Sequence, residues 1–339
     1  MMNTTLPDTE ISTSPKTEAT PEKSVRSWKR IFVNRFGHFR ALWRMAIYIA
    51  AFFVLGIAIN WLVSLIVGKD SEQEIFSWVF GLKLIARSLP FLLAALLVLN
   101  LVDRRPFALL GFHFRRGWLR EMLLGMAIGF VLITLMVGIL LVFGVVTLEV
   151  RSLFWSNLAL LPVFLLLFVL AAWWEELFAR GYLMQSLAEG SRPWIAAIIM
   201  SLPFTLGHLD NPNPSAMAMV NIFLLSLMVS VAYFKTRSLW LPLGLHFTWN
   251  WTQGSLWGFN VSGIEIGRSV FIANPQGSDL WTGGAFGAEG SLALAIIAAL
   301  SVIWMWRTRW IRTSEANVKL WKSYPRGFNL PPQDSPDES

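Results

Sequence analysis

The chain contains no cysteine and little charge, and among its aromatic residues tyrosine is scarce. The absence of cysteine excludes disulfide bonds, thiolate nucleophiles and thiolate metal sites. Charged residues make up only 14% of the 339 residues, whereas 55% are hydrophobic. The apolar residues form runs of about 20, the length of a transmembrane helix. This composition predicts a polytopic membrane protein rather than a soluble domain.

The positive charge of the chain could serve to bind nucleic acid or to orient the chain in a membrane. A net charge of +7 and a pI near 10.0 are compatible with nucleic-acid binding. The basic residues cluster beside the apolar runs, however, so membrane topology and anionic lipid explain them better. We therefore expect the lipid bilayer, and not nucleic acid, as a partner. His38 and His113 lie in these basic segments and are expected to be solvated.

Composition divides the chain into three parts. Residues 1–40 are expected to form a cytoplasmic tail that is disordered and then basic, and residues 313–339 a second disordered tail. Residues 41–312 between them are expected to form an all-α transmembrane domain of about eight helices. The apolar segments lie at about 42–67, 79–102, 118–144, 153–174, 194–209, 216–234, 239–259 and 290–306.

The basic residues also predict a topology. If the two tails and the loops near 103–120, 175–193 and 235–238 lie on one side, that side holds 23 of the 28 Lys and Arg residues and the other side three. By the positive-inside rule, both termini are cytoplasmic. We expect a multi-pass integral membrane protein, in the plasma membrane if the source is bacterial. The loop 260–289 would lie outside, and nothing in it indicates chemistry.

Two adjacent acids, Glu175 and Glu176, interrupt the apolar stretch from Leu153 to Leu187. An ionised carboxylate in hydrocarbon is costly, which makes an intramembrane acid a candidate functional residue. The alternative is a pair that merely ends a helix at the water interface. Helical spacing lets Arg180 pair with Glu176 and hold it ionised, while Glu175 points about 100° away around the helix.

Two histidines also lie in apolar runs. Phe204 precedes His208 by four residues, and His246 precedes Asn250 by four, so each pair lies on one helix face. A lone histidine on an apolar face is more often a satisfied core residue. Polar sets in three consecutive apolar segments instead favour a functional site.

The spacing of the acids and histidines predicts that they meet. The segment 189–193, Glu-Gly-Ser-Arg-Pro, is a helix stop, a turn and a helix start midway between Glu175 and His208. An antiparallel hairpin turning there places both residues roughly 25 Å from the turn. His246 reaches the same depth if the hairpin tip projects roughly 10 Å into the cytoplasm.

We therefore expect Glu175, His208, His246 and Asn250 to converge on one cavity open to the cytoplasm. Burying these groups apart from one another would leave several unpaired polar side chains in hydrocarbon. The polar segment 210–214 follows His208 and is expected to line a wet cavity unless it reaches the outer surface.

Three motifs, in this order, carry a resemblance to a known family: Glu175-Glu176-x-x-x-Arg180, Phe204-x-x-x-His208 and His246-x-x-x-Asn250. They resemble the signature of the CPBP intramembrane proteases, also called the Abi or type II CAAX prenyl endopeptidase family, which includes the Rce1-type proteases. The resemblance covers about residues 150–255 and implies an eight-helix bundle that hydrolyses peptide bonds in the membrane. The best-known branch removes the residues after a prenylated C-terminal cysteine, whereas many bacterial members are linked to bacteriocin immunity.

Hydrolysis needs an activated water and a stabilised oxyanion, and the polar residues suit both. We expect Glu175 to be the general base, because low-dielectric walls and a second carboxylate favour that role. His208 would orient the water. His246 and Asn250 would donate hydrogen bonds to the oxyanion, each worth about 3 kcal/mol. The expected substrate is a membrane-associated peptide or a lipidated protein.

Other chemistries use the same residues. Glu175, His208 and His246 are a candidate ligand set for a divalent metal such as zinc, with a fourth position for water, although no His-Glu-x-x-His motif is present. The expected cofactor is therefore none or one divalent metal. Two non-enzymatic alternatives remain. One is a peptide-binding membrane protein of the bacteriocin-immunity type, and the other is a transporter that uses the acids and histidines as a proton relay.

The topology can be tested directly, because the chain contains no native cysteine. A cysteine introduced at Ser335 is expected to resist a membrane-impermeant maleimide in intact cells and to react after permeabilisation. The same result is expected for a cysteine in the 103–120 loop. Labelling of either cysteine from outside intact cells would contradict the topology.

Overall fold

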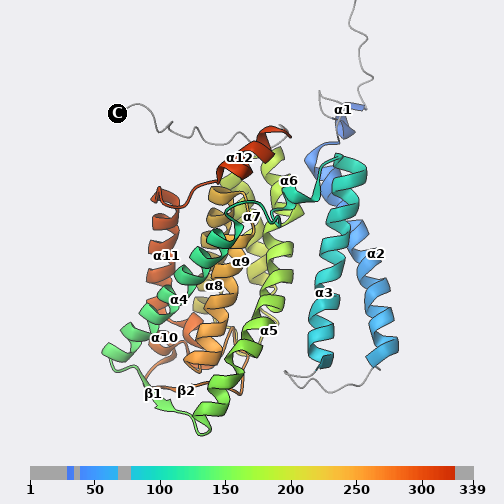
Figure 1. The fold of residues 1–339 in the computed structure, drawn as a ribbon. Helices are drawn as coiled ribbons and strands as arrows, with labels where there is room; N and C mark the ends of the chain where they lie inside the picture. Colours follow the sequence, from blue (N-terminus) through green and yellow to red (C-terminus); the bar gives the residue numbers. More distant parts are fainter. Residues whose placement is uncertain (1–28, 34–38, 68–77, 325–339) are drawn as a thin grey trace, which may run out of the picture.

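The computed structural model describes residues 29–33, 39–67 and 78–324, and in this part the protein is mostly helical (Figure 1). Two short strands, β1 (Val146–Val150) and β2 (Phe271–Pro275), pair antiparallel. The helices are α1 (Lys29–Phe32), α2 (Ala41–Val67), α3 (Trp78–Leu97), α4 (Trp118–Val142), α5 (Phe154–Arg180), α6 (Tyr182–Gly190), α7 (Pro193–Leu206), α8 (Ala216–Thr236), α9 (Trp240–Trp251), α10 (Asp279–Thr282), α11 (Leu292–Arg307) and α12 (Glu315–Lys322).

Five helical stretches in the described residues are long and apolar enough to cross a membrane. They start with α2, α3, α4, α5 and α8, and the fourth stretch runs from α5 through α6. The helices α7 and α11 are apolar but shorter. The protein is therefore a multi-pass integral membrane protein. Each of the eight apolar segments seen in the sequence contains one helix, namely α2, α3, α4, α5, α7, α8, α9 or α11.

The connections gather at two ends of the bundle (Figure 1). One end carries β1 and β2 and is called the sheet end. The other end, the α12 end, carries the α8–α9 turn, where Leu239 N donates to Gly111 O at 3.1 Å and Asn317 Nδ2 donates to Thr236 O at 3.1 Å. The segment 210–214 belongs to the sheet end, because Asn211 Nδ2 donates to Ser262 O at 2.9 Å.

The sheet end is more ordered than the sequence indicates. The expectation of an all-α fold is wrong in detail, because β1 joins β2 from the 260–289 loop. Val and Ile are frequent in these two strands, and both residues favour extended backbone. The loop also supplies Glu289, which is buried and accepts hydrogen bonds from Trp249 Nε1 at 3.2 Å and from Ser262 N at 2.6 Å. Glu289 therefore ties this loop to α9.

The segment 175–193, counted among the inside segments by its charge, is helical up to the predicted turn. The helix α5 continues to Arg180, and α6 runs from Tyr182 to Gly190. The break between them falls at Gly181, where a Cβ would lie 2.1 Å from Leu177 O. The predicted turn is confirmed, because α6 ends at Gly190 and α7 begins at Pro193.

Charged residues hold α6 at the α12 end. Glu189 of α6 bonds to Arg44 of α2 at 2.6 Å and also to Arg105. Arg44 bonds in turn to Asp103 at 3.2 Å, and Tyr182 donates to Asp103 at 2.9 Å. Each of these charges is buried, so each needs the others as partners. Arg44 and Glu189 are therefore structural residues as well as contributors to the charge pattern.

Two expectations at the α12 end are wrong. The tail beginning at residue 313 contains α12, which packs with Leu320 and Trp321 buried, because its apolar side chains lie on one face. The rest of that tail and most of residues 1–40, including His38, lie outside the described residues. His113 is buried rather than solvated, and burial together with nearby Arg115 lowers its pKa.

Helices α4 and α9 are in backbone contact, because glycine replaces side chains along their contact. A Cβ on Gly125 would lie 2.2 Å from Leu241 O, and one on Gly129 would lie 2.5 Å from Leu245 O. A Cβ on Gly244 of α9 would likewise lie 2.3 Å from Met122 O of α4. Small residues four apart allow such backbone contact between membrane helices. We call this contact the glycine seam.

We expect Gly125→Leu to destabilise the fold, because two backbones would have to separate. Overpacking of this kind costs about 1–3 kcal/mol. The measurement is the thermal unfolding midpoint of the detergent-solubilised protein. The matched control is Gly138→Leu in the same helix, where a Cβ would have nothing within 4 Å. Equal midpoints for the two variants would contradict the glycine seam.

Candidate active site

Arg180 is the centre of a buried ion-pair network between α5 and α8. Its Nη1 donates to Glu176 Oε1 at 3.0 Å, one helical turn earlier. Its Nη2 donates to Ser226 Oγ at 2.8 Å and Ser226 O at 2.7 Å, and its Nε donates to Ser230 Oγ at 3.3 Å. Both charged side chains are almost inaccessible, at 1% and 0%. The predicted pairing of Arg180 with Glu176 is therefore confirmed.

Ser226 and Ser230 are functional candidates that the sequence analysis missed. They lie four residues apart in α8, so both hydroxyls reach the same side chain of α5. A buried guanidinium needs several acceptors, and these residues supply them. The available signal was the four-residue spacing of two small polar residues in an apolar helix. Because serine is common in membrane helices, that signal is weak by itself.

His246 of α9 joins the two acids. Its Nδ1 lies 2.7 Å from Glu176 Oε1, and its Nε2 lies 3.4 Å from Glu175 Oε2. The first distance is that of a charge-assisted hydrogen bond, and the second is longer than an ordinary one. Glu176 is inaccessible, whereas the Glu175 side chain is 18% exposed. His246 is therefore held firmly by the buried acid and loosely by the accessible one.

One oxygen of the buried acid is left over. Glu176 Oε1 accepts hydrogen bonds from both Arg180 and His246. Glu176 Oε2 is buried and has no hydrogen-bond partner among the described residues. A buried polar atom without a partner costs about 1–3 kcal/mol. A bound water or a substrate N–H group would remove that cost.

Phe204 connects His208 to this network. Its ring lies 4.9 Å from the Arg180 guanidinium carbon, 4.9 Å from the His208 ring and 6.2 Å from the His246 ring. His208 Nδ1 donates to Phe204 O at 2.8 Å, because a carbonyl oxygen can only accept. The neutral His208 ring therefore presents Nε2 as an acceptor.

The structure brings together most of the residues singled out in the sequence. Glu175, Glu176, Arg180 and His246 are in direct contact, and His208 packs beside them through Phe204. Asn250 lies one turn beyond His246 on α9 and is half-buried. No hydrogen bond among the described residues joins Asn250 or His208 to the two acids.

The described residues do not form a metal-holding group. No three His, Asp or Glu side chains in this part of the chain converge as metal ligands would. Both nitrogens of His246 face carboxylates instead, and Nδ1 of His208 is used by the backbone. The proposed ligand set Glu175, His208 and His246 does not fit a metal in this arrangement.

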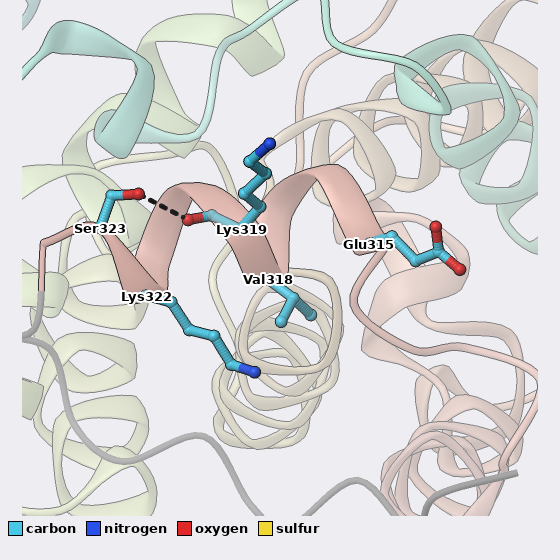
Figure 2. A pocket seen from close by; sticks show the side chains of 5 residues that line it. All are labelled: Glu315, Val318, Lys319, Lys322 and Ser323. Carbon is cyan, nitrogen blue, oxygen red and sulfur yellow. Dashed lines mark hydrogen bonds between the residues drawn. The ribbon is translucent and has the colours of Figure 1, made fainter. Parts of the chain in front are cut away.

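A surface hollow lies outside this network. Figure 2 shows it on α12, lined by Glu315, Val318, Lys319, Lys322 and Ser323. Its one drawn hydrogen bond runs within the helix, from Ser323 Oγ to Lys319 O at 3.0 Å. Because no residue of α5, α7 or α9 lines it, the hollow is not part of the candidate active site.

The fold and the site define a class, namely a multi-pass helical membrane protein with an acid, histidine and arginine network buried between its helices. Within that class, residues 155–252 match the family model of the Rce1-like type II CAAX prenyl endopeptidases. The match covers 98 of the 339 residues, so this segment is similar to an Rce1-like CPBP-family domain, and the likeness suggests a protease. No curated protein matches the chain.

We expect Arg180→Met to destabilise the protein strongly, because it leaves Glu176 buried without its cation. Breaking a buried pair costs about 3–5 kcal/mol. The double variant Glu176→Gln with Arg180→Met is expected to recover part of the loss in thermal unfolding midpoint. Arg192→Met, at an exposed arginine, serves as the control. A double variant less stable than Arg180→Met would contradict the pairing.

Proposed function

We propose that the protein is an intramembrane endopeptidase that hydrolyses a peptide bond in a membrane-associated or prenylated substrate. The observation that carries the proposal is the contact of His246 with both Glu175 and Glu176 inside the family-matched segment. Paired acids in membrane helices are costly unless they serve a function. The family match supports peptide-bond chemistry over other uses of the same network.

The proposed reaction begins with proton transfer to Glu175. Arg180 keeps Glu176 ionised, and Glu176 then accepts from His246 Nδ1, which fixes the orientation of the ring. Glu175 is the accessible acid, so it takes a proton from water as the water oxygen attacks the scissile carbonyl carbon. Glu175 then gives this proton to the amine nitrogen as the carbon–nitrogen bond breaks, either directly or through His246 Nε2, which receives the Glu175 proton in exchange for the one it gives. The products are a carboxylic acid and an amine, and both side chains return to their starting protonation states.

Two further residues complete the proposed site. The Nε2 acceptor of His208 suits the orientation of a water molecule beside Glu175. The Asn250 side-chain amide supplies a hydrogen bond to the oxyanion, a contribution of about 3 kcal/mol. Because His246 faces carboxylates on both nitrogens, we assign it to proton exchange, whereas the sequence suggested that it donates to the oxyanion.

The arrangement of connections supports eight membrane crossings with both termini cytoplasmic. Successive helices carry the chain between the sheet end and the α12 end, and the short α7 and α9 are followed by segments that reach the sheet end. The basic residues near Arg44, Arg105 and Arg237 lie at the α12 end, which we assign to the cytoplasm. The site would then be reached from the cytoplasmic half of the bundle.

A peptide-binding protein without turnover is the main alternative, and a proton-coupled transporter a more remote one. All three functions could use the same buried acids and histidine. They differ in what a conservative change at Glu175 does. A binder retains its ligand after loss of the base, a transporter loses coupling, and only a protease accumulates uncut substrate.

We expect Glu175→Gln to abolish cleavage, with a loss of about 10²–10⁴-fold in turnover, while leaving the amount of protein in the membrane unchanged. The measurement is a comparison of membrane peptides from cells with wild type and variant. The matched control is Glu149→Gln, at an exposed carboxylate on β1. Identical peptide profiles for wild type and Glu175→Gln would overturn the protease assignment.

A further inference from the structure

A groove between α2 and α3 lies outside the candidate active site. It has a volume of about 650 Å³, within the size range of ligand pockets. Its lining on α2 extends from Phe52 to Val67, the last residue of that helix. Residues from three helices line it: Phe52, Gly56, Asn60, Val63, Ser64 and Val67 of α2, Lys83, Arg87, Pro90 and Phe91 of α3, and Trp174 of α5.

Arg87 is the unusual member of this lining. It lies nine residues into α3, roughly 14 Å from the helix start, within an apolar stretch long enough to span a membrane. Its side chain is exposed, and its guanidinium carbon lies 4.1 Å from the centre of the Trp174 ring. Stacking on tryptophan orients the guanidinium but provides no negative charge. An exposed arginine at this depth is costly unless a polar partner reaches it.

The walls around Arg87 suit a hydrocarbon chain. Phe91 stacks against Trp174 at 6.2 Å, and Gly56 leaves space beside Pro90, where a Cβ would reach Pro90 only at 3.9 Å. The outer face of α2 carries exposed apolar side chains such as Ile57 at 72%. The face of α2 beside the groove is therefore apolar and accessible to lipid.

The described lining combines two basic residues, Lys83 and Arg87, with polar groups and apolar walls, and it contains no acid. Asn60 Nδ2 donates to Gly56 O at 2.9 Å, which leaves the Asn60 side-chain oxygen as an acceptor. Arginine binds phosphate oxygens in a planar, two-point manner, whereas an apolar groove binds an acyl chain. An amphiphile with one anionic head satisfies both requirements.

We propose that this groove binds an anionic phospholipid, with the phosphate on Arg87 and an acyl chain along Gly56 and Val63. The site is separate from the hydrolytic network, although Trp174 precedes Glu175 in α5. A bound lipid would fill the space between α2 and α3 and hold Trp174 in place. It would therefore stabilise the α2–α3 pair against the rest of the bundle.

The test is native mass spectrometry of the full-length protein titrated with dioleoyl phosphatidylglycerol or dioleoyl phosphatidylcholine. We expect one tightly retained phosphatidylglycerol and weaker retention of phosphatidylcholine. Arg87→Gln is expected to weaken phosphatidylglycerol binding about tenfold, the loss expected for one charge-assisted hydrogen bond. Gly56→Leu is expected to weaken binding of both lipids, because the added side chain occupies the acyl groove.

Two control variants separate this site from general effects. Arg268→Gln removes an exposed arginine at the sheet end, and Gly81→Leu adds the same side chain to α3, where a Cβ has nothing within 4 Å. Both are expected to bind lipid as wild type does. Folding is checked for every variant by its elution profile and thermal midpoint without added lipid.

Several outcomes would overturn the proposal. Equal retention of the two lipids would show an acyl groove without headgroup selection. Equal effects of Arg87→Gln and Arg268→Gln would show only a loss of total charge. Stabilisation by inorganic phosphate to the same extent as by phosphatidylglycerol would show a phosphate site without a lipid. Displacement of the lipid by a prenylated peptide, with Arg87→Gln raising the KM for that peptide, would show a substrate site instead.

Discussion

The pairing of Glu176 with Arg180 is the interaction on which the rest of the site depends. Two charges are taken out of water in the middle of apolar helices, and neither is tolerable without the other. Arg180 then draws Ser226 and Ser230 of α8 toward α5, and Glu176 draws His246 of α9. One ion pair thus fixes three helices relative to one another and leaves Glu175 as the accessible acid.

Much of this arrangement could be predicted from the sequence, because its signals are local. Apolar runs located the membrane helices, and a four-residue spacing gave the pairing of Arg180 with Glu176. The turn before Pro193 followed from a glycine, a serine and a proline within four residues. These features depend on residues within one or two helical turns, so no knowledge of the tertiary structure was needed.

The features that escaped prediction depend on contacts between distant segments. The bridge from His246 to both acids requires the relative rotation of α5 and α9, which sequence spacing does not fix. Strand β1 pairs with a segment more than a hundred residues away, and His113 is buried by its surroundings rather than by its own hydropathy. The helix α12 is short and polar on one face, so its composition matched that of a tail.

The glycine seam also sets the depth of the histidine. Together with the π-helical residues Thr252–Leu256 that follow it, α9 is about 25 Å long, shorter than a hydrocarbon core of about 30 Å. At 25 residues, α4 is about 38 Å long and takes its position from the thickness of the bilayer. Backbone contact without intervening side chains lets neither helix slide along the other. The position that α4 takes in the bilayer therefore sets the position of α9. Hydrophobic matching of α4 thus places the His246 side chain at a fixed depth in the membrane.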